Sequence, residues 1–292
     1  MNVTFSEYES MDFTYAHNLS EEPTLESINH IEIHSFYEIN FFISGDVTYF
    51  IEGHEYKPQK NQFLIINNKE LHKPEFHSSK PYERIVLYFN PKLLYQYQTP
   101  TFNLLYCFER RKLGKRNLIA PTDPEELLRF FQRFEHYIKS DLPERELMLR
   151  LLFLEFIILL NNLYSKDQDH PIQVHPIKSD PLCEAIIAHL NENLTENITL
   201  EELSAQFFTN KYSLCRTFKK GTGFTVIEYL TYKRIMLAKE FLSEGVSITD
   251  TCYNVGFNNY SNFYKAFKTA VGVSPRKFID AIAKPNITKE SP

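Results

Sequence analysis

The sequence predicts an α+β protein of two parts: an N-terminal antiparallel β-barrel or jelly roll with two helices, and an all-α C-terminal domain. Three observations support this prediction. Residues 31–89 alternate apolar and polar side chains between turn signals, as short antiparallel strands do. Two segments with helical apolar periodicity follow them. The C-terminal region then contains a repeat with a period of 49 residues.

The barrel strands are expected between turns at residues 44–46, 52–53 and 58–61. Successive side chains on a strand point to opposite faces, so His34 and Glu38 share one face. We expect both side chains to point into the barrel and His72 to lie at its rim.

The two helices are expected at residues 124–139 and 143–164. The second is apolar on more than one face, because Leu147, Leu151 and Ile158 share it with several other aliphatic and aromatic residues. One face then covers its own domain while another meets a second chain, or the helix is fully buried. Periodicity alone leaves both alternatives open.

A linker is expected where the apolar periodicity stops. Residues 165–181 contain three prolines and no periodic apolar face, a composition typical of an exposed connection. We therefore expect a first domain at residues 1–164, a linker at 165–180 and a second domain at 181–292.

The repeat has the form of a helix-turn-helix. TNKYSLCRTFKKGTG (209–223) recurs as NNYSNFYKAFKTAVG (258–272). In the first copy, Thr199 and Glu202 form a capping box that begins one helix, and Asn210 caps the next. Leu214 and Phe218 then form an inward apolar stripe. The second helix of such a unit enters the major groove of DNA.

The side chains left on the outer faces are candidates for DNA contact. Arg216 is the best placed to donate two hydrogen bonds to guanine, with a phosphate contact as the main alternative. Lys219 and Lys268 lie toward helix ends, where phosphate contact or solvation is expected. The full set comprises Lys211, Tyr212, Cys215, Arg216, Lys219, Tyr260, Ser261, Asn262, Lys265 and Lys268.

Residues 181–278 resemble the AraC-type family of bacterial transcription regulators. The likeness rests on ITLEELSAQF, SLCRTFKKGTGFT, SITDTCYNVGF and NFYKAFKTAVGVSPRKF. Thr251 and Cys252 stand where Ile and Ala are usual in the family, and Lys265 stands where Arg is common. The resemblance implies a sequence-specific regulator of transcription, most often an activator, that responds to a small effector and works with RNA polymerase.

The same resemblance implies a sensor in the barrel. His34, Glu38 and His72 partly match the motifs of cupin barrels, which such regulators often carry. Tyr37 and Arg84 are weaker pocket candidates. These groups would form a small-molecule pocket, with a sugar as one possible effector, or ligate iron or manganese, or serve only the structure. We predict the pocket, with no bound metal and no cofactor.

Composition favours a DNA-binding protein of the cytoplasm. The formal net charge is −5, but residues 181–292 carry +2 and residues 1–180 carry −7, so the acidic excess lies in the first part. The N-terminus lacks the pattern of a signal peptide, and four dispersed cysteines suggest reduced thiols. No membrane span is expected, because charged and amide side chains interrupt the longest apolar stretch.

Two other functions remain open at this stage. One is a metal-dependent cupin enzyme fused to a DNA-binding domain. The other is a constitutive DNA-binding protein whose barrel only dimerises. No catalytic triad, phosphate-binding loop or dinucleotide-binding turn is visible in the sequence, so we expect no enzyme. A homodimer that binds double-stranded DNA is expected.

Overall fold

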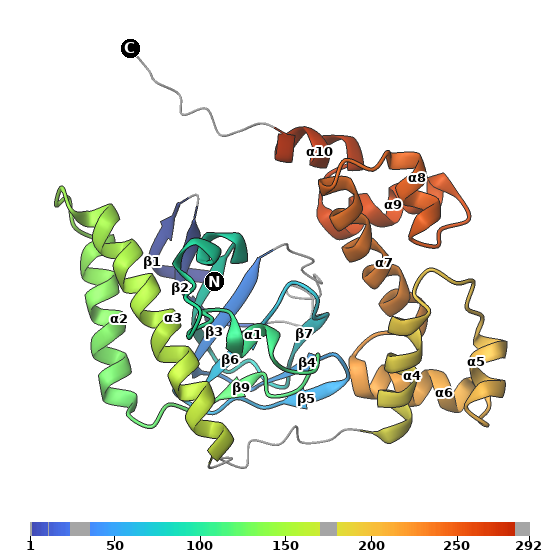
Figure 1. Ribbon diagram of the computed structural model, residues 1–292. Coiled ribbons are helices and arrows are strands. Elements are labelled where there is room, and N and C mark those ends of the chain that lie inside the picture. The colour runs from blue at the N-terminus through green and yellow to red at the C-terminus, as the bar shows by residue number, and fades with distance from the viewer. Residues whose placement is uncertain (1, 11, 24–35, 170–179, 284–292) are drawn as a thin grey trace. The chain divides into compact units, whose positions relative to one another are not determined.

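The computed structural model describes residues 2–10, 12–23, 36–169 and 180–283. These residues form two compact units, one on each side of the gap at 170–179. The first unit contains the β-sheets and two long helices, and the second is entirely helical (Figure 1). The predicted fold class is confirmed.

The first unit is built from two antiparallel sheets. The large sheet has the strand order β1-β2-β8-β3-β6-β9, and the small sheet has the order β5-β4-β7. The strands are β1 (Asn2–Glu9), β2 (Phe13–Ser20), β3 (Tyr37–Ser44), β4 (Val47–Ile51), β5 (His54–Tyr56), β6 (Phe63–Ile66), β7 (His72–Phe76), β8 (Tyr82–Phe89) and β9 (Leu118–Ile119). We did not predict β1 and β2. β1 is an edge strand that buries only two side chains, so its apolar alternation is weak.

The large sheet separates two apolar cores. On β3, Ile39 and Phe41 belong to the core on one side, whereas Phe42 belongs to the core on the other side with residues of the small sheet. This separation follows from the alternation of side chains along a strand. The second core is the interior between the two sheets.

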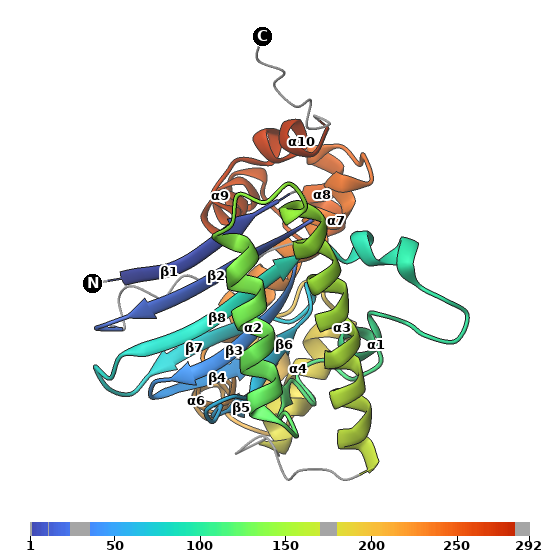
Figure 2. The same ribbon diagram turned by 90° about the vertical axis from the view of Figure 1, so that its left-hand side faces the viewer.

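Two long helices cover the outer face of the large sheet. α2 (Pro124–Ile138) and α3 (Arg145–Asp169) run side by side across it (Figure 2). Aromatic rings fill the space beneath them: Phe13 stacks on Phe153 with ring centres 4.5 Å apart, and Phe41 lies 4.9 Å from Phe131. α3 extends to Asp169, so the predicted linker begins later than expected. The rest of that linker lies outside the described residues.

α3 is apolar on its outer face as well. Leu147, Leu151 and Ile158 are 60%, 50% and 43% exposed. Residues 145–166 have the length and composition of a membrane-crossing helix, but half of their most apolar window is buried inside the unit. That burial is typical of a core helix in a folded domain.

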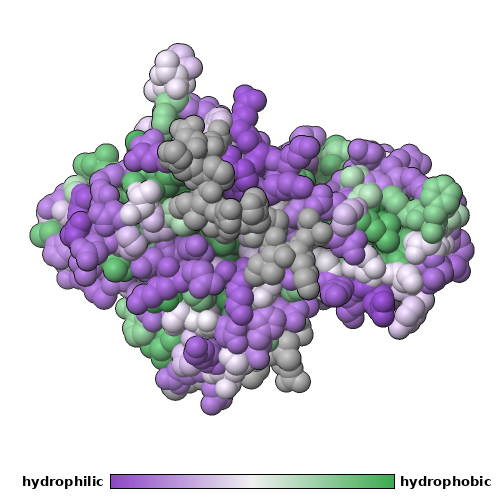
Figure 3. Space-filling model, turned by 90° about the horizontal axis from the view of Figure 1, so that it is seen from below, coloured by the Kyte–Doolittle hydropathy of each residue, from purple (hydrophilic) through white to green (hydrophobic). Residues whose placement is uncertain are grey.

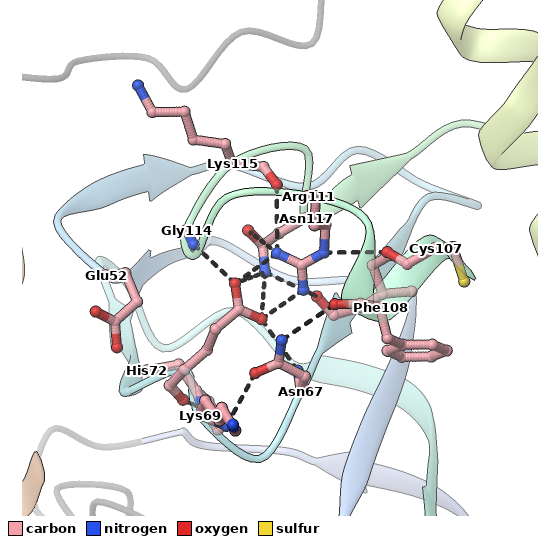
Figure 4. Close-up of polar contacts among 12 residues, drawn as sticks. Glu52, Asn67, Lys69, His72, Cys107, Phe108, Arg111, Gly114, Lys115 and Asn117 are labelled. Atoms are coloured by element: carbon pink, nitrogen blue, oxygen red, sulfur yellow. Dashed lines mark hydrogen bonds and ion pairs between the residues drawn. The ribbon is translucent and has the colours of Figure 1, made fainter. Parts of the chain in front are cut away.

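A buried ion pair fixes the segment that leads from β8 to α2. After a 3-10 helix (Pro91–Tyr97) and α1 (Tyr106–Glu109), Arg111 donates from Nη2 to Oε2 of Glu70 at 2.5 Å, and the backbone N–H of Gly114 donates to Glu70 Oε1 at 2.7 Å (Figure 4). Asn117 adds two further hydrogen bonds to the same carboxylate. Burial alone would raise the pKa of the Glu70 carboxyl, but the guanidinium and the N–H donors outweigh burial and lower that pKa.

The second unit contains seven helices in the described part of the chain. They are α4 (Pro181–Glu192), α5 (Leu200–Gln206), α6 (Lys211–Thr222), α7 (Val226–Ser243), α8 (Ile248–Asn254), α9 (Tyr260–Val271) and α10 (Pro275–Ala283). The predicted capping box at Thr199 and the caps at Asn210 and Asn259 are all present. α5 with α6 and α8 with α9 therefore form the two predicted helix-turn-helix motifs.

Candidate DNA-binding surface and effector site

The second helix of each motif packs mainly by a pair of fully buried side chains and exposes its outer face to solvent. Leu214 and Phe218 on α6, and Phe263 and Phe267 on α9, are fully buried. Cys215 is half-buried, so it is less accessible than its spacing suggested. The remaining predicted contact residues are exposed: Lys211, Tyr212, Arg216, Lys219, Tyr260, Ser261, Asn262, Lys265 and Lys268.

The outer face of the first motif has two local features. Lys211 forms an ion pair with Glu201 of α5, so this lysine is partly neutralised before any DNA contact. Phe208, in the turn between α5 and α6, is 98% exposed and has a φ of 50°, a region that non-glycine residues rarely adopt. Figure 3 shows hydrophobic side chains on the side of the molecule where α5 and α6 lie.

Arg234 of α7 connects the two motifs. Its Nε donates to the carbonyl oxygen of Leu194 at 2.9 Å, and its Nη2 donates to that of Glu196 at 2.6 Å, both in the loop before α5. Gly256, in the turn of the second motif, adopts a φ of +89°, and a Cβ there would lie 2.6 Å from Thr195 O and 3.0 Å from Arg234 Cζ. The loop of one motif and the turn of the other therefore meet at this guanidinium, which we call the Arg234 bridge. We did not predict it from the sequence.

Polar side chains from both sheets meet in the interior between them. Nε2 of His72 lies 3.1 Å from Oε2 of Glu38, and both side chains are buried. The other ring nitrogen, Nδ1, lies 3.1 Å from the carbonyl oxygen of Glu70. A carbonyl oxygen only accepts, so Nδ1 carries a hydrogen. The imidazole of His72 and the carboxyl of Glu38 thus lie within ion-pair distance of each other.

A second interior cluster consists of an amide and two phenols. Asn40 Nδ2 donates to the hydroxyl of Tyr49 at 2.9 Å and to that of Tyr82 at 3.4 Å, and the two hydroxyls bond each other. Burial raises the pKa of both phenols above the usual value, so both are neutral. The guanidinium of Arg84 lies over the Tyr82 ring, with Cζ 4.6 Å from the ring centre.

The structure brings together three of the five predicted effector residues. Glu38, His72 and Arg84 all belong to the interior, although His72 is buried there and not at the rim. Tyr37 lies in the core beneath the helices, on the opposite face of β3, where its hydroxyl donates to Glu109 at 3.1 Å. His34 lies outside the described residues. Within the described residues, no three His, Cys, Asp or Glu side chains converge as metal ligands do.

Sequence reasoning missed Asn40 and Tyr82 as members of the interior. Asn40 is two residues from Glu38, so the alternation that assigned Glu38 to the interior assigns Asn40 to it as well. Tyr82 begins a strand of mixed composition, and its sequence gives no comparable signal.

Comparison with known proteins identifies the family. Residues 28–157 match the family model of the AraC-like ligand binding domain, and residues 203–281 match a helix-turn-helix domain. The chain belongs to the AraC family of transcription regulators. It is 33% identical over 136 residues to the uncharacterized HTH-type transcriptional regulator YdiP of Escherichia coli, and 28% identical over 127 residues to the HTH-type transcriptional activator RhaS of Klebsiella pneumoniae.

These similarities have a limited extent. The YdiP match covers 45% of this chain, the RhaS match covers 43%, and each covers 43% of the relative. The crystal structure of ToxT from Vibrio cholerae matches 94% of this chain and all of its own, with 14% identity and a TM-score of 0.42. The chain spans less than half the length of these two sequence relatives.

Proposed function

We propose that this protein is a transcription activator that binds a specific DNA site as a homodimer in the cytoplasm and responds to a small polar effector. The observation that carries the proposal is the pair of helix-turn-helix motifs joined by α7 and the Arg234 bridge, with cationic residues exposed on both second helices. The relative RhaS is named an activator, which supports the sign of regulation.

DNA reading is assigned to α6 and α9. α7 contains 18 residues, a length of about 27 Å at 1.5 Å per residue. A rigid connection of this size is compatible with two helices entering successive major-groove segments about 34 Å apart. Arg216 is proposed to read a guanine, and the exposed lysines are proposed to bind phosphates. One chain would then cover an asymmetric site.

Dimerisation is assigned to the outer face of α3. Leu147, Leu151 and Ile158 lie one to three turns apart on this face, and each is at least 43% exposed in the single chain. An apolar stripe of this kind on an otherwise packed helix is typical of a surface that meets a second copy. The buried side of α3 covers its own sheet, so both functions expected of this helix are compatible with the structure.

Effector binding is assigned to the interior between the sheets, where Glu38, His72 and Arg84 lie near Asn40 and two tyrosines. A sugar or a related polar metabolite fits hydrogen-bonding groups of these types. We assign the barrel no catalytic role, since its described polar groups are accounted for by pairing and by ligand recognition.

The test is transcription reconstituted with purified components. DNA fragments from the source genome are first selected by binding to the full chain, and each is then placed upstream of a promoter with RNA polymerase. The proposal predicts that a selected fragment binds well above random DNA and that transcription rises when the protein and a metabolite are both present. Equal binding to all fragments would contradict it. Transcription that is independent of every metabolite would favour a constitutive regulator.

A further inference from the structure

The turn of the first helix-turn-helix motif contains a phenylalanine that the packing of the unit does not use. At the end of α5, the N–H of Phe208 donates to the carbonyl oxygen of Ala205 at 3.2 Å. The N–H of Thr209 donates to the carbonyl oxygen of Ser204 at 3.0 Å. These two bonds form a Schellman motif, whose left-handed residue is usually glycine. Phe208 occupies that position with a φ of 50°, and it is 98% exposed.

The second motif builds the same turn with the residue that this conformation favours. Gly256, in the turn after α8, has a φ of +89°, and its N–H donates to the carbonyl oxygen of Tyr253 at 3.0 Å. The N–H of Phe257 donates to that of Cys252 at 3.1 Å. Glycine adopts this backbone conformation without strain, and a side chain with a Cβ does not. A strained and almost fully exposed Phe208 in place of glycine indicates a contact with another molecule.

Phe208 lies at the end of α6 that is proposed to enter the major groove. It is two residues before Asn210, the N-cap of α6, so their Cα atoms are at most about 7.6 Å apart. Lys211 and Tyr212 follow in the first turn, and Tyr212 is 75% exposed. In a helix-turn-helix, residues at the N-terminus of the second helix contact base edges. The ring of Phe208 is therefore within reach of the base pairs that this first turn would read.

A phenyl ring has few partners on DNA. It forms no ordinary hydrogen bond with a phosphate or a base edge, and the apolar group that base pairs present in the major groove is the C5-methyl of thymine. Phenylalanine is among the side chains that contact this methyl group. We propose that Phe208 packs on the methyl group of one thymine at the edge of the segment read by α6 and selects for thymine there. The inference rests on the proposed reading of DNA by α6 and deepens it.

The test removes the methyl group and the ring separately and together. Each thymine of a selected operator is replaced in turn by deoxyuridine, which lacks only the methyl group, and affinity is measured for the full-length wild-type protein and for Phe208→Gly. We expect one replacement to weaken wild-type binding by about fourfold, as the loss of one buried methyl-sized group predicts. Phe208→Gly should bind the unmodified operator at least about fourfold more weakly and should lose nothing further at that position.

The choice of variants separates the contact from the stability of the turn. Glycine suits the backbone of this turn, so Phe208→Gly should lose affinity without losing stability. Phe208→Ala removes the same ring and should lose the same affinity, with a lower free energy of unfolding than Phe208→Gly. Tyr95→Ala removes an aromatic ring that is 56% exposed in the first unit. This control should retain the wild-type affinity and the wild-type response to every deoxyuridine.

The other outcomes each overturn the inference in a distinct way. If Phe208→Gly loses the same affinity on every operator and on random DNA, and its loss is coupled to no thymine, the ring contacts the sugar-phosphate backbone. Unchanged affinity with weaker activation of RNA polymerase would assign the ring to a protein contact. Unchanged affinity and unchanged transcription would remove Phe208 from function altogether. Selective binding of the wild-type protein to its operator tests the proposed function independently of these results.

Discussion

The Arg234 bridge makes a sharp prediction about the spacing of the DNA site. Arg234→Ala removes two hydrogen bonds from a guanidinium to the backbone carbonyls of Leu194 and Glu196. A hydrogen bond to a charged group contributes about 1.5–3 kcal/mol when buried. Arg234 is half-buried and solvent screens it in part, so we expect the free energy of unfolding of this unit to fall by about 2–4 kcal/mol.

The effect on DNA binding is separable from the effect on stability. If the bridge holds the two motifs in one orientation, inserting one base pair between the two halves of the operator displaces one groove segment by about 3.4 Å and rotates it. The wild-type protein should then lose at least about tenfold in affinity. Arg234→Ala should bind the native operator more weakly but lose less on insertion, because its two motifs move independently.

The assay is a fluorescence titration with operators that carry insertions or deletions of one to three base pairs. Ile235→Val is the matched control, since Ile235 is buried on the same helix and lies outside the bridge. It should lower stability by about 0.5–1.5 kcal/mol and retain the wild-type spacing profile. The reasoning would be refuted if Arg234→Ala, under conditions in which the variant is fully folded, showed the same dependence of affinity on operator spacing as the wild-type protein.

Four further predictions concern single side chains. Arg216→Ala should weaken binding to the cognate operator by about 1–3 kcal/mol and relax selectivity at one base, whereas Lys219→Ala should weaken binding to all DNA sequences alike and flatten the salt dependence. If both variants lose equal affinity on specific and on random DNA, Arg216 does not read a base. The free energy of unfolding should be about 1 kcal/mol higher for Phe208→Gly than for Phe208→Ala, because only glycine adopts the positive φ of this position without strain. Equal denaturation midpoints for the two variants would argue against backbone strain at this position. Burial lowers the pKa of Lys239 to about 8, so between pH 8 and 10.5 the unfolded chain binds a proton that the folded chain does not. Lys239→Met should therefore raise the free energy of unfolding by about 3 kcal/mol at pH 7 and by progressively less toward pH 10.5. A gain that does not change with pH would contradict the lowered pKa of Lys239. Leu151→Glu should halve the mass in light scattering while retaining the circular dichroism spectrum, and an unchanged mass would remove the outer face of α3 from the interface.

Local signals in the sequence predicted the C-terminal unit closely. Its helix starts depend on side chains that accept from backbone N–H groups within three residues, as Asn210 and Asn259 do. Its inward stripes follow the helical period. The ends at Gly223 and Gly272 also have the left-handed φ that favours glycine. These determinants are close in sequence, so a repeat and a few caps suffice to locate the helices.

The interior of the first unit depends on contacts that are distant in sequence. Asn40 bonds to Tyr82, and the pair forms only because β3 and β8 are neighbours in the sheet. Glu70 and Arg111 form a buried pair across 41 residues, and nothing local in either segment predicts that pairing. The Arg234 bridge is of the same kind, since its acceptors are backbone carbonyls, which have no sequence signature.

The most direct test of the account is a hydroxyl-radical footprint of one chain on an operator selected from random DNA. Two recognition helices held by α7 and the Arg234 bridge predict two protected segments about one helical turn apart on one face of the duplex, with Arg216→Ala losing protection in only one of them. A single protected segment, or equal loss of both segments in Arg216→Ala, would contradict the claim that the two motifs read the site together.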